Sequence, residues 1–138
     1  MRKSTTPQEH KQRFYAALAN QQLRSSPVVR MELYNGARNA EEIRQVDERL
    51  KVWELPLAPA IADIAADAVA ALVSPGFIKL GDALIAATAR AHRIAVLTCD
   101  WSDFPQLAEN LRFDLYHPLD EARVLRRDPR HSMEAGDS

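Results

Sequence analysis

The sequence has almost no cysteine and no long apolar run. Cys99 is the only cysteine among 138 residues, which excludes an internal disulfide and a cysteine-rich zinc site. The longest apolar candidate, residues 57–73, is interrupted by Pro59, Asp63 and Asp67, whereas a membrane span needs about 20 apolar residues. The N-terminus is polar and lacks the apolar core of a signal peptide. We therefore expect a cytoplasmic protein that does not enter the membrane.

The charges of the chain nearly cancel. Lys and Arg number 18 and Asp and Glu number 19, for a net charge of -1. This balance excludes a protein whose whole surface is basic and binds nucleic acid, but it does not exclude a local basic groove. The composition, with 46% hydrophobic and 27% charged residues, is that of an ordinary globular protein, and the length suits one domain. We predict a folded domain over residues 1–118 and a polar, Arg-rich, disordered tail over residues 119–138.

Helix signals dominate the chain. Caps, prolines and apolar residues at spacings of three and four predict helices, and two β-favouring runs predict strands. The short segment 27–29 fits either a strand or the lead-in to a helix. Helices that feed short buried strands indicate an α/β layer fold with a small parallel sheet, although two strands are few for so many helices. The expected helices cover residues 5–21, 29–37, 39–53, 59–73, 81–92 and 104–110, and the expected strands cover 94–98 and 112–116, the latter at an edge.

Four acidic residues lie where solvent should be scarce. Glu32 interrupts an apolar segment, and Asp82 begins the most apolar helix, where the helix dipole favours a carboxylate. Asp100 follows an apolar strand, and Asp103 comes three residues later. The carboxyl end of a parallel strand is where open α/β sheets place their ligands.

A cluster of these acids would suit a divalent cation. Crowded carboxylates repel one another, and Mg²⁺ or Mn²⁺ bound by their oxygens would remove that repulsion and serve phosphodiester cleavage. Spacing alone leaves other interpretations open. Asp82 can be a helix cap, Glu32 a surface residue, and Asp100 and Asp103 ordinary turn and cap residues.

Three segments that carry these acids resemble the motifs of PIN-domain proteins, in particular the VapC-type toxins of type II toxin–antitoxin pairs. MELYNGAR over residues 31–38 is similar to the family's Glu-Leu-x-x-Gly-Ala signature. LGDALIAATA over residues 80–89 is similar to its second acidic motif, and VLTCDWSDF over residues 96–104 to its third. The motifs occur in the family's order. The likeness covers roughly residues 13–117 and is most specific around Asp82.

The resemblance implies a PIN-like three-layer α/β/α sandwich around a small parallel sheet, and a Mg²⁺-dependent endoribonuclease, with Mn²⁺ as the alternative ion. It implies that Asp82 binds the metal directly and that Glu32 binds through water or orders the site. Asp100 and Asp103 would complete the cluster. The metal would generate a nucleophilic water and shield the scissile phosphate. The implied partners are an RNA substrate, a cognate VapB-type antitoxin and a second copy in a homodimer.

The chain departs from the family at its N-terminus. Family members open with a strand that ends in a metal-binding Asp, whereas here the first Asp is Asp47 and Glu9 is the only acid before Glu32. We expect that the first strand is missing, that the complete protein starts upstream of Met1, and that this chain is weakly active or inactive. The alternative function is a truncated, catalytically inactive PIN remnant that only binds antitoxin or RNA. A third is a helical interaction module whose acids are scattered in space.

Overall fold

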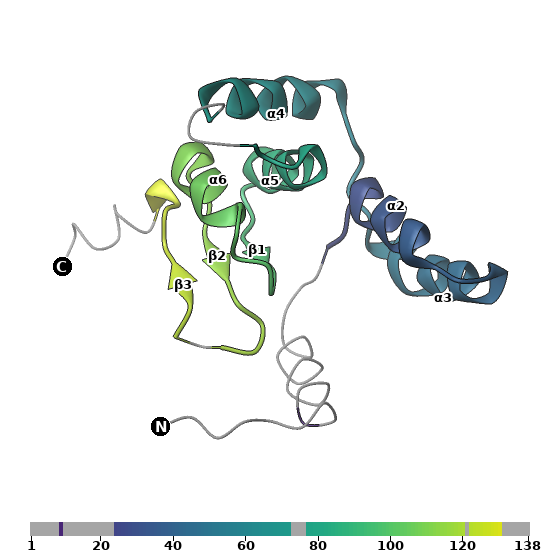
Figure 1. Cartoon of the computed structure of the whole chain (residues 1–138). Coiled ribbons are helices and arrows are strands. Elements are labelled where there is room, and N and C mark those ends of the chain that lie inside the picture. Colours follow the sequence, from purple (N-terminus) through teal and green to yellow (C-terminus); the bar gives the residue numbers. More distant parts are fainter. Residues whose placement is uncertain (1–8, 10–23, 73–76, 121, 131–138) are drawn as a thin grey trace.

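The computed structural model describes residues 9, 24–72, 77–120 and 122–130. Helices α4, α5 and α6 lie over a small sheet, and α2 and α3 stand to one side (Figure 1). The helix expected over residues 5–21 lies outside the described residues except for Glu9, which is helical. In chain order the elements are α2 (Pro27–Gly36), α3 (Ala40–Leu50), the 3-10 helix η1 (Lys51–Trp53), α4 (Pro59–Ala71), α5 (Leu80–His92), β1 (Val96–Leu97), α6 (Phe104–Leu111), β2 (Leu115–Tyr116) and β3 (Val124–Leu125).

Local signals set where the helices begin. The Ser26 hydroxyl accepts a hydrogen bond from the Val29 amide at 3.2 Å, so the ambiguous segment 27–29 opens a helix rather than a strand. The Asn39 side chain likewise accepts from the Glu42 amide at 3.0 Å and caps α3 as predicted. Pro59 occupies the first position of α4, which is also as predicted.

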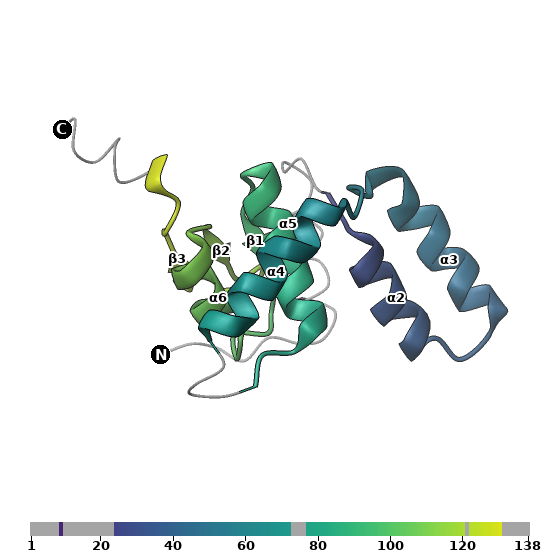
Figure 2. The same ribbon diagram turned by 90° about the horizontal axis from the view of Figure 1, so that it is seen from above.

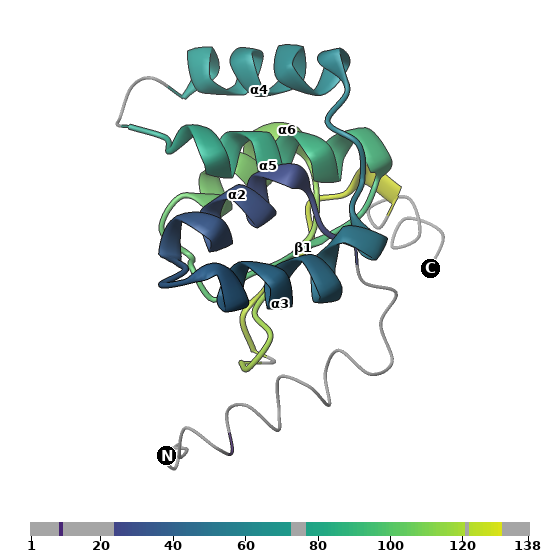
Figure 3. The same ribbon diagram turned by 90° about the vertical axis from the view of Figure 1, so that its right-hand side faces the viewer.

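Helices α2 and α3 form a pair that projects from the body of the molecule. Figures 2 and 3 show them beside α5, with α2 the nearer of the two. Val28 is the only buried residue of α2, and α3 has none. Backbone hydrogen bonds join the segment before α2 to the segment after η1. One of them runs from the Leu55 amide to the Ser25 carbonyl at 2.8 Å.

Helix α5 is the centre of the core. Its small apolar residues allow α4, α6 and the sheet to approach closely, which explains why a helix that is apolar almost all round is stable here. Leu107 and Leu115 are fully buried. The remaining core residues are Ile61, Ala65, Ala68, Ile78, Ala83, Ala86, Ala87, Ala89, Val96, Phe104, Ala108 and Phe113. No helix in the described segments is both long and apolar enough to span a bilayer.

The sheet is mixed rather than parallel. β1 pairs with β2 in parallel, and β2 pairs with β3 antiparallel, in the order β1-β2-β3. The prediction that residues 112–116 form an edge strand is therefore wrong, because β2 lies between two partners. Among the described residues no strand precedes β1, and only an isolated bridge joins Ser25 to Glu54.

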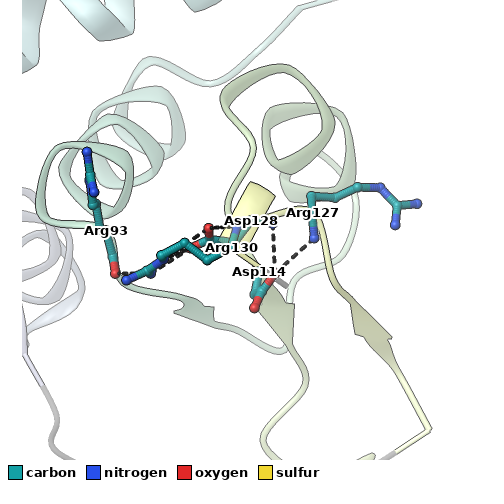
Figure 4. Close-up of polar contacts among 5 residues, drawn as sticks. All are labelled: Arg93, Asp114, Arg127, Asp128 and Arg130. Atoms are coloured by element: carbon teal, nitrogen blue, oxygen red, sulfur yellow. Dashed lines mark hydrogen bonds and ion pairs between the residues drawn. The ribbon is translucent and has the colours of Figure 1, made fainter. Parts of the chain in front are cut away.

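Part of the segment predicted as a disordered tail belongs to the sheet. Besides β3, a clasp holds this segment to the body (Figure 4): Asp114 Oδ1 accepts hydrogen bonds from the Arg127 and Asp128 amides at 2.9 and 3.0 Å. The Arg130 guanidinium pairs with Asp128 at 2.6 Å and donates to the Arg93 carbonyl, at the end of α5, at 2.8 Å. The sequence prediction missed this because the partners are distant along the chain. The domain boundary at residue 118 stays a prediction.

Replacing Asp114 with Ala should loosen the C-terminal segment. Asp114 is 5% exposed, and its carboxylate accepts hydrogen bonds from two backbone amides. In the variant both amides would lose this charged acceptor. We expect a loss of about 2 kcal/mol in the free energy of unfolding and a Tm lower by roughly 5 °C. Thermal unfolding followed by circular dichroism measures this. The exposed Asp67 on α4, replaced by Ala, is the control. A Tm within about 1 °C of the wild type would contradict the clasp.

Candidate metal centre

Asp82 lies in the first turn of α5 and is 8% exposed. Its Oδ2 atom is buried and has no hydrogen-bond partner among the described residues. Such an atom is costly to bury and calls for a functional or structural explanation. The interpretation of Asp82 as the helix cap is wrong, because the N-cap position is Lys79, whose side chain makes no capping bond.

Glu32 reaches this turn from α2. Glu32 as a whole is exposed. Its Oε1 atom nevertheless lies so close to Gly81 that a Cβ atom added to Gly81 would lie within 3.0 Å of this oxygen. Glu32 is therefore not a solvated surface residue alone. Its carboxylate lies against the N-terminal end of α5, where the helix dipole favours negative charge.

Asp100 and Asp103 approach from the loop between β1 and α6. Asp103 Oδ2 accepts a hydrogen bond from the Lys79 amide at 3.3 Å, which links this loop to the start of α5. Asp100 Oδ1 accepts from the Ser102 amide and hydroxyl at 3.0 and 2.6 Å, so Asp100 is also a turn residue, as the alternative interpretation held.

Three of the carboxylates act electrostatically on the fourth, Asp82. Burial raises the pKa of Asp82, and the charges of Asp100, Glu32 and Asp103 raise it further, while Lys79 opposes them. The pKa of Asp100 is lowered, mainly by its hydrogen bonds from Ser102. Acids from two other segments, α2 and the loop between β1 and α6, thus act on Asp82, which argues against an interaction module with scattered acids.

The donor set fits a divalent cation. Carboxylate oxygens are the ligands that Mg²⁺ and Mn²⁺ prefer, and Asp82 Oδ2 has no hydrogen-bond partner among the described residues. Within the described segments, no group of three or more His, Cys, Asp or Glu side chains is close enough to hold an ion by itself. Mg²⁺ usually takes one or two carboxylates and completes its coordination shell with water and substrate phosphate, so two close acids suffice.

Sequence reasoning missed the supporting residues. Gly81 leaves room for the Glu32 carboxylate, and the charge of Lys79 partly offsets the negative charges around Asp82. The Ser102 hydroxyl donates a hydrogen bond to Asp100. The only available signal was their place next to the acids, with a glycine directly before Asp82 and a serine between the two later aspartates. That signal does not specify the contacts, because they join separate segments.

Comparison with known proteins identifies the family to which the chain belongs. A family model described as PIN domain matches residues 4–110, which is most of the chain. The chain belongs to the PIN-domain family. PIN domains are generally nucleases and typically use divalent metals, and the predicted α/β fold of the family is confirmed.

Two solved structures share the PIN fold. One, the structure of FitAB bound to an IR36 DNA fragment, matches with a TM-score of 0.65 and 21% identity over 83% of this chain and 87% of that chain. The other, FitAcB from Neisseria gonorrhoeae, matches with a TM-score of 0.61 and 24% identity over 78% and 85%. No curated protein matches the chain.

Replacing Asp82 with Asn should stabilise the PIN domain when divalent cations are chelated. The pKa of Asp82 is raised in the folded state, so the folded protein binds this proton more tightly than the unfolded chain does. The free energy of unfolding therefore falls as the pH rises from about 3.9, the pKa of an unperturbed Asp, through the pKa of Asp82 in the folded state. Asn removes the charge responsible. At pH 7 we expect a Tm higher than that of the wild type by a few degrees, measured by thermal unfolding in a chelator.

The gain should vanish near pH 3, where Asp82 is protonated in both the folded and the unfolded state. Asp63→Asn is the control, because Asp63 is exposed on α4 and should show no such pH-dependent gain. An unchanged or lower Tm of Asp82→Asn at pH 7 would show that the charge of Asp82 carries no cost in the folded protein.

Proposed function

We propose that this PIN domain is a Mg²⁺-dependent endoribonuclease, with Mn²⁺ as the alternative ion, and that it is the VapC-type toxin of a toxin–antitoxin pair. The observation that carries the proposal is the buried, unpartnered Asp82 Oδ2 at the start of α5, with three further carboxylates acting on it. A carboxylate that is destabilised by burial and by like charges gains the most from a bound cation.

Each acid has a distinct role in this proposal. Asp82 binds the metal directly, Glu32 binds through water or orders the site, and Asp100 and Asp103 complete the cluster. When bound, the divalent ion supplies a nucleophilic water and neutralises charge on the scissile phosphate. The Asp103 bond to the Lys79 amide and the Ser102 bonds to Asp100 keep the later acids in place before substrate arrives.

The proposed partners are an RNA substrate, a VapB-type antitoxin and a second copy of the chain. The resemblance of the three acidic motifs to VapC-type toxins supports the antitoxin, and the FitAB and FitAcB structures are neighbours in fold. In this proposal the antitoxin inhibits the nuclease by covering the four acidic residues. Size-exclusion chromatography with light scattering would test the homodimer.

A second candidate is the catalytically inactive PIN remnant, which binds antitoxin or RNA without cutting it. The observation in its favour is that no three metal-ligating side chains in the described part of the chain lie close enough to hold an ion unaided. This candidate would bind antitoxin or RNA but would lack metal-dependent turnover.

RNA cleavage by the purified full chain separates the two candidates. With Mg²⁺ or Mn²⁺ present, the nuclease candidate predicts endonucleolytic fragments that disappear in EDTA and that form slowly, as expected of a weakly active chain. Asp82→Asn should lower the rate by roughly 100-fold, while the exposed-helix control Asp63→Asn should not. Gel analysis of a labelled RNA measures the rate. RNA retention in a gel-shift assay without cleavage under any metal condition would favour the inactive remnant, and cleavage that is insensitive to EDTA or to Asp82→Asn would refute the proposed site.

A further inference from the structure

The contact between Glu32 and Gly81 depends on a missing side chain. An ideal Cβ at position 81 would lie within 3.0 Å of Glu32 Oε1, a separation that real Cβ atoms essentially never show. Its other neighbours are ordinary contacts, 3.5 Å from Val28 Cγ1 and 3.6 Å from Glu32 Cδ. The space that a larger residue would need is thus taken by the end of one acidic side chain.

Backbone conformation does not explain this glycine. Gly81 lies inside the first turn of α5, and no described glycine has a positive φ. Alanine is the better helix former and fits the backbone at this position. An alanine side chain, however, would occupy the space of the Glu32 carboxylate. Position 81 therefore needs a glycine because of the neighbouring helix α2.

We propose that Gly81 is a positioning residue for Glu32: by lacking a side chain, it lets the Glu32 carboxylate lie beside Asp82 in the cation site. This inference rests on the proposed function, because it concerns the same metal centre. The charge of Glu32 acts on Asp82, and Asp82 Oδ2 has no partner among the described residues. A cation shared by their oxygens, directly or through water, would satisfy both groups.

The proposal separates cation binding from folding. In Gly81→Ala the clashing atom is the far end of a flexible side chain, so Glu32 can swing away from α5 with little strain in the core. We expect the Tm of Gly81→Ala in chelator to equal or exceed that of the wild type. We expect its Kd for Mn²⁺ to rise about tenfold or more, as when a group that supports a metal site is lost.

Isothermal titration of the full chain with MnCl₂ measures the Kd, and thermal unfolding in chelator measures the fold. Gly36→Ala is the matched control, because Gly36 is also helical and a Cβ there would meet nothing within 4 Å. Its Kd for Mn²⁺ should stay at the wild-type value. A wild-type Kd in Gly81→Ala would overturn the positioning role while leaving the metal site intact.

A double-mutant cycle tests whether Gly81 acts through Glu32. Glu32→Ala alone should weaken Mn²⁺ binding, and adding Gly81→Ala to it should cause no further loss, because no carboxylate remains to be displaced. A further tenfold loss in the Glu32→Ala background would show that position 81 acts by another route and would overturn the proposal. If the wild type itself binds no Mn²⁺, the proposed metal function fails, and this inference fails with it.

Discussion

The close approach of α2 to the first turn of α5 is the contact on which the candidate site depends. This contact brings the Glu32 carboxylate of α2 close to the buried Asp82 of α5. Gly81, which has no side chain, leaves room for the Glu32 carboxylate. Burial contributes little to this approach, because Val28 is the only buried residue of α2. Polar contacts fix α2 against the segment that follows η1: the Arg30 guanidinium donates two hydrogen bonds to the Glu54 carboxylate at 2.7 and 3.0 Å, and Arg30 also donates to the Tyr34 hydroxyl. A partly buried, bidentate pair of this kind fixes direction better than apolar contact does.

The stability of the domain and the chemistry of its site come from different parts of the molecule. The apolar layers of α4, α5 and α6 contain no buried acid besides Asp82 within the described segments of these helices. Asp82 lies at the end of that core, where burial and three neighbouring charges oppose its ionisation. The protein tolerates this cost because the alanine-rich interface between α4 and α5 and the clasp at Asp114 stabilise the fold independently. Functional sites commonly carry such a cost, which the rest of the structure offsets.

Local signals predicted much of the fold. Asn39 and Pro59 start their helices as expected, because a cap or a proline acts within a single turn. The strand order and β3 were not predictable in this way. Asp114 binds the amides of Arg127 and Asp128, and nothing in that Arg-rich segment reveals an acceptor more than ten residues earlier. Charge runs are usually solvated, and only the folded chain shows that this one is held down.

The sequence prediction named the four acids of the candidate site, but it could not show how differently the structure restrains them. Asp103 is bound to the Lys79 amide and Asp100 to Ser102, so both are held by the backbone around the site. Glu32 has no such bond among the described residues, and its position follows that of α2. A displacement of α2 would therefore move one carboxylate and leave the others in place. Because a divalent ion responds steeply to the number and placement of its oxygen ligands, the orientation of this projecting helix pair would set the cation affinity of the proposed metal centre, even though the pair adds little to the core.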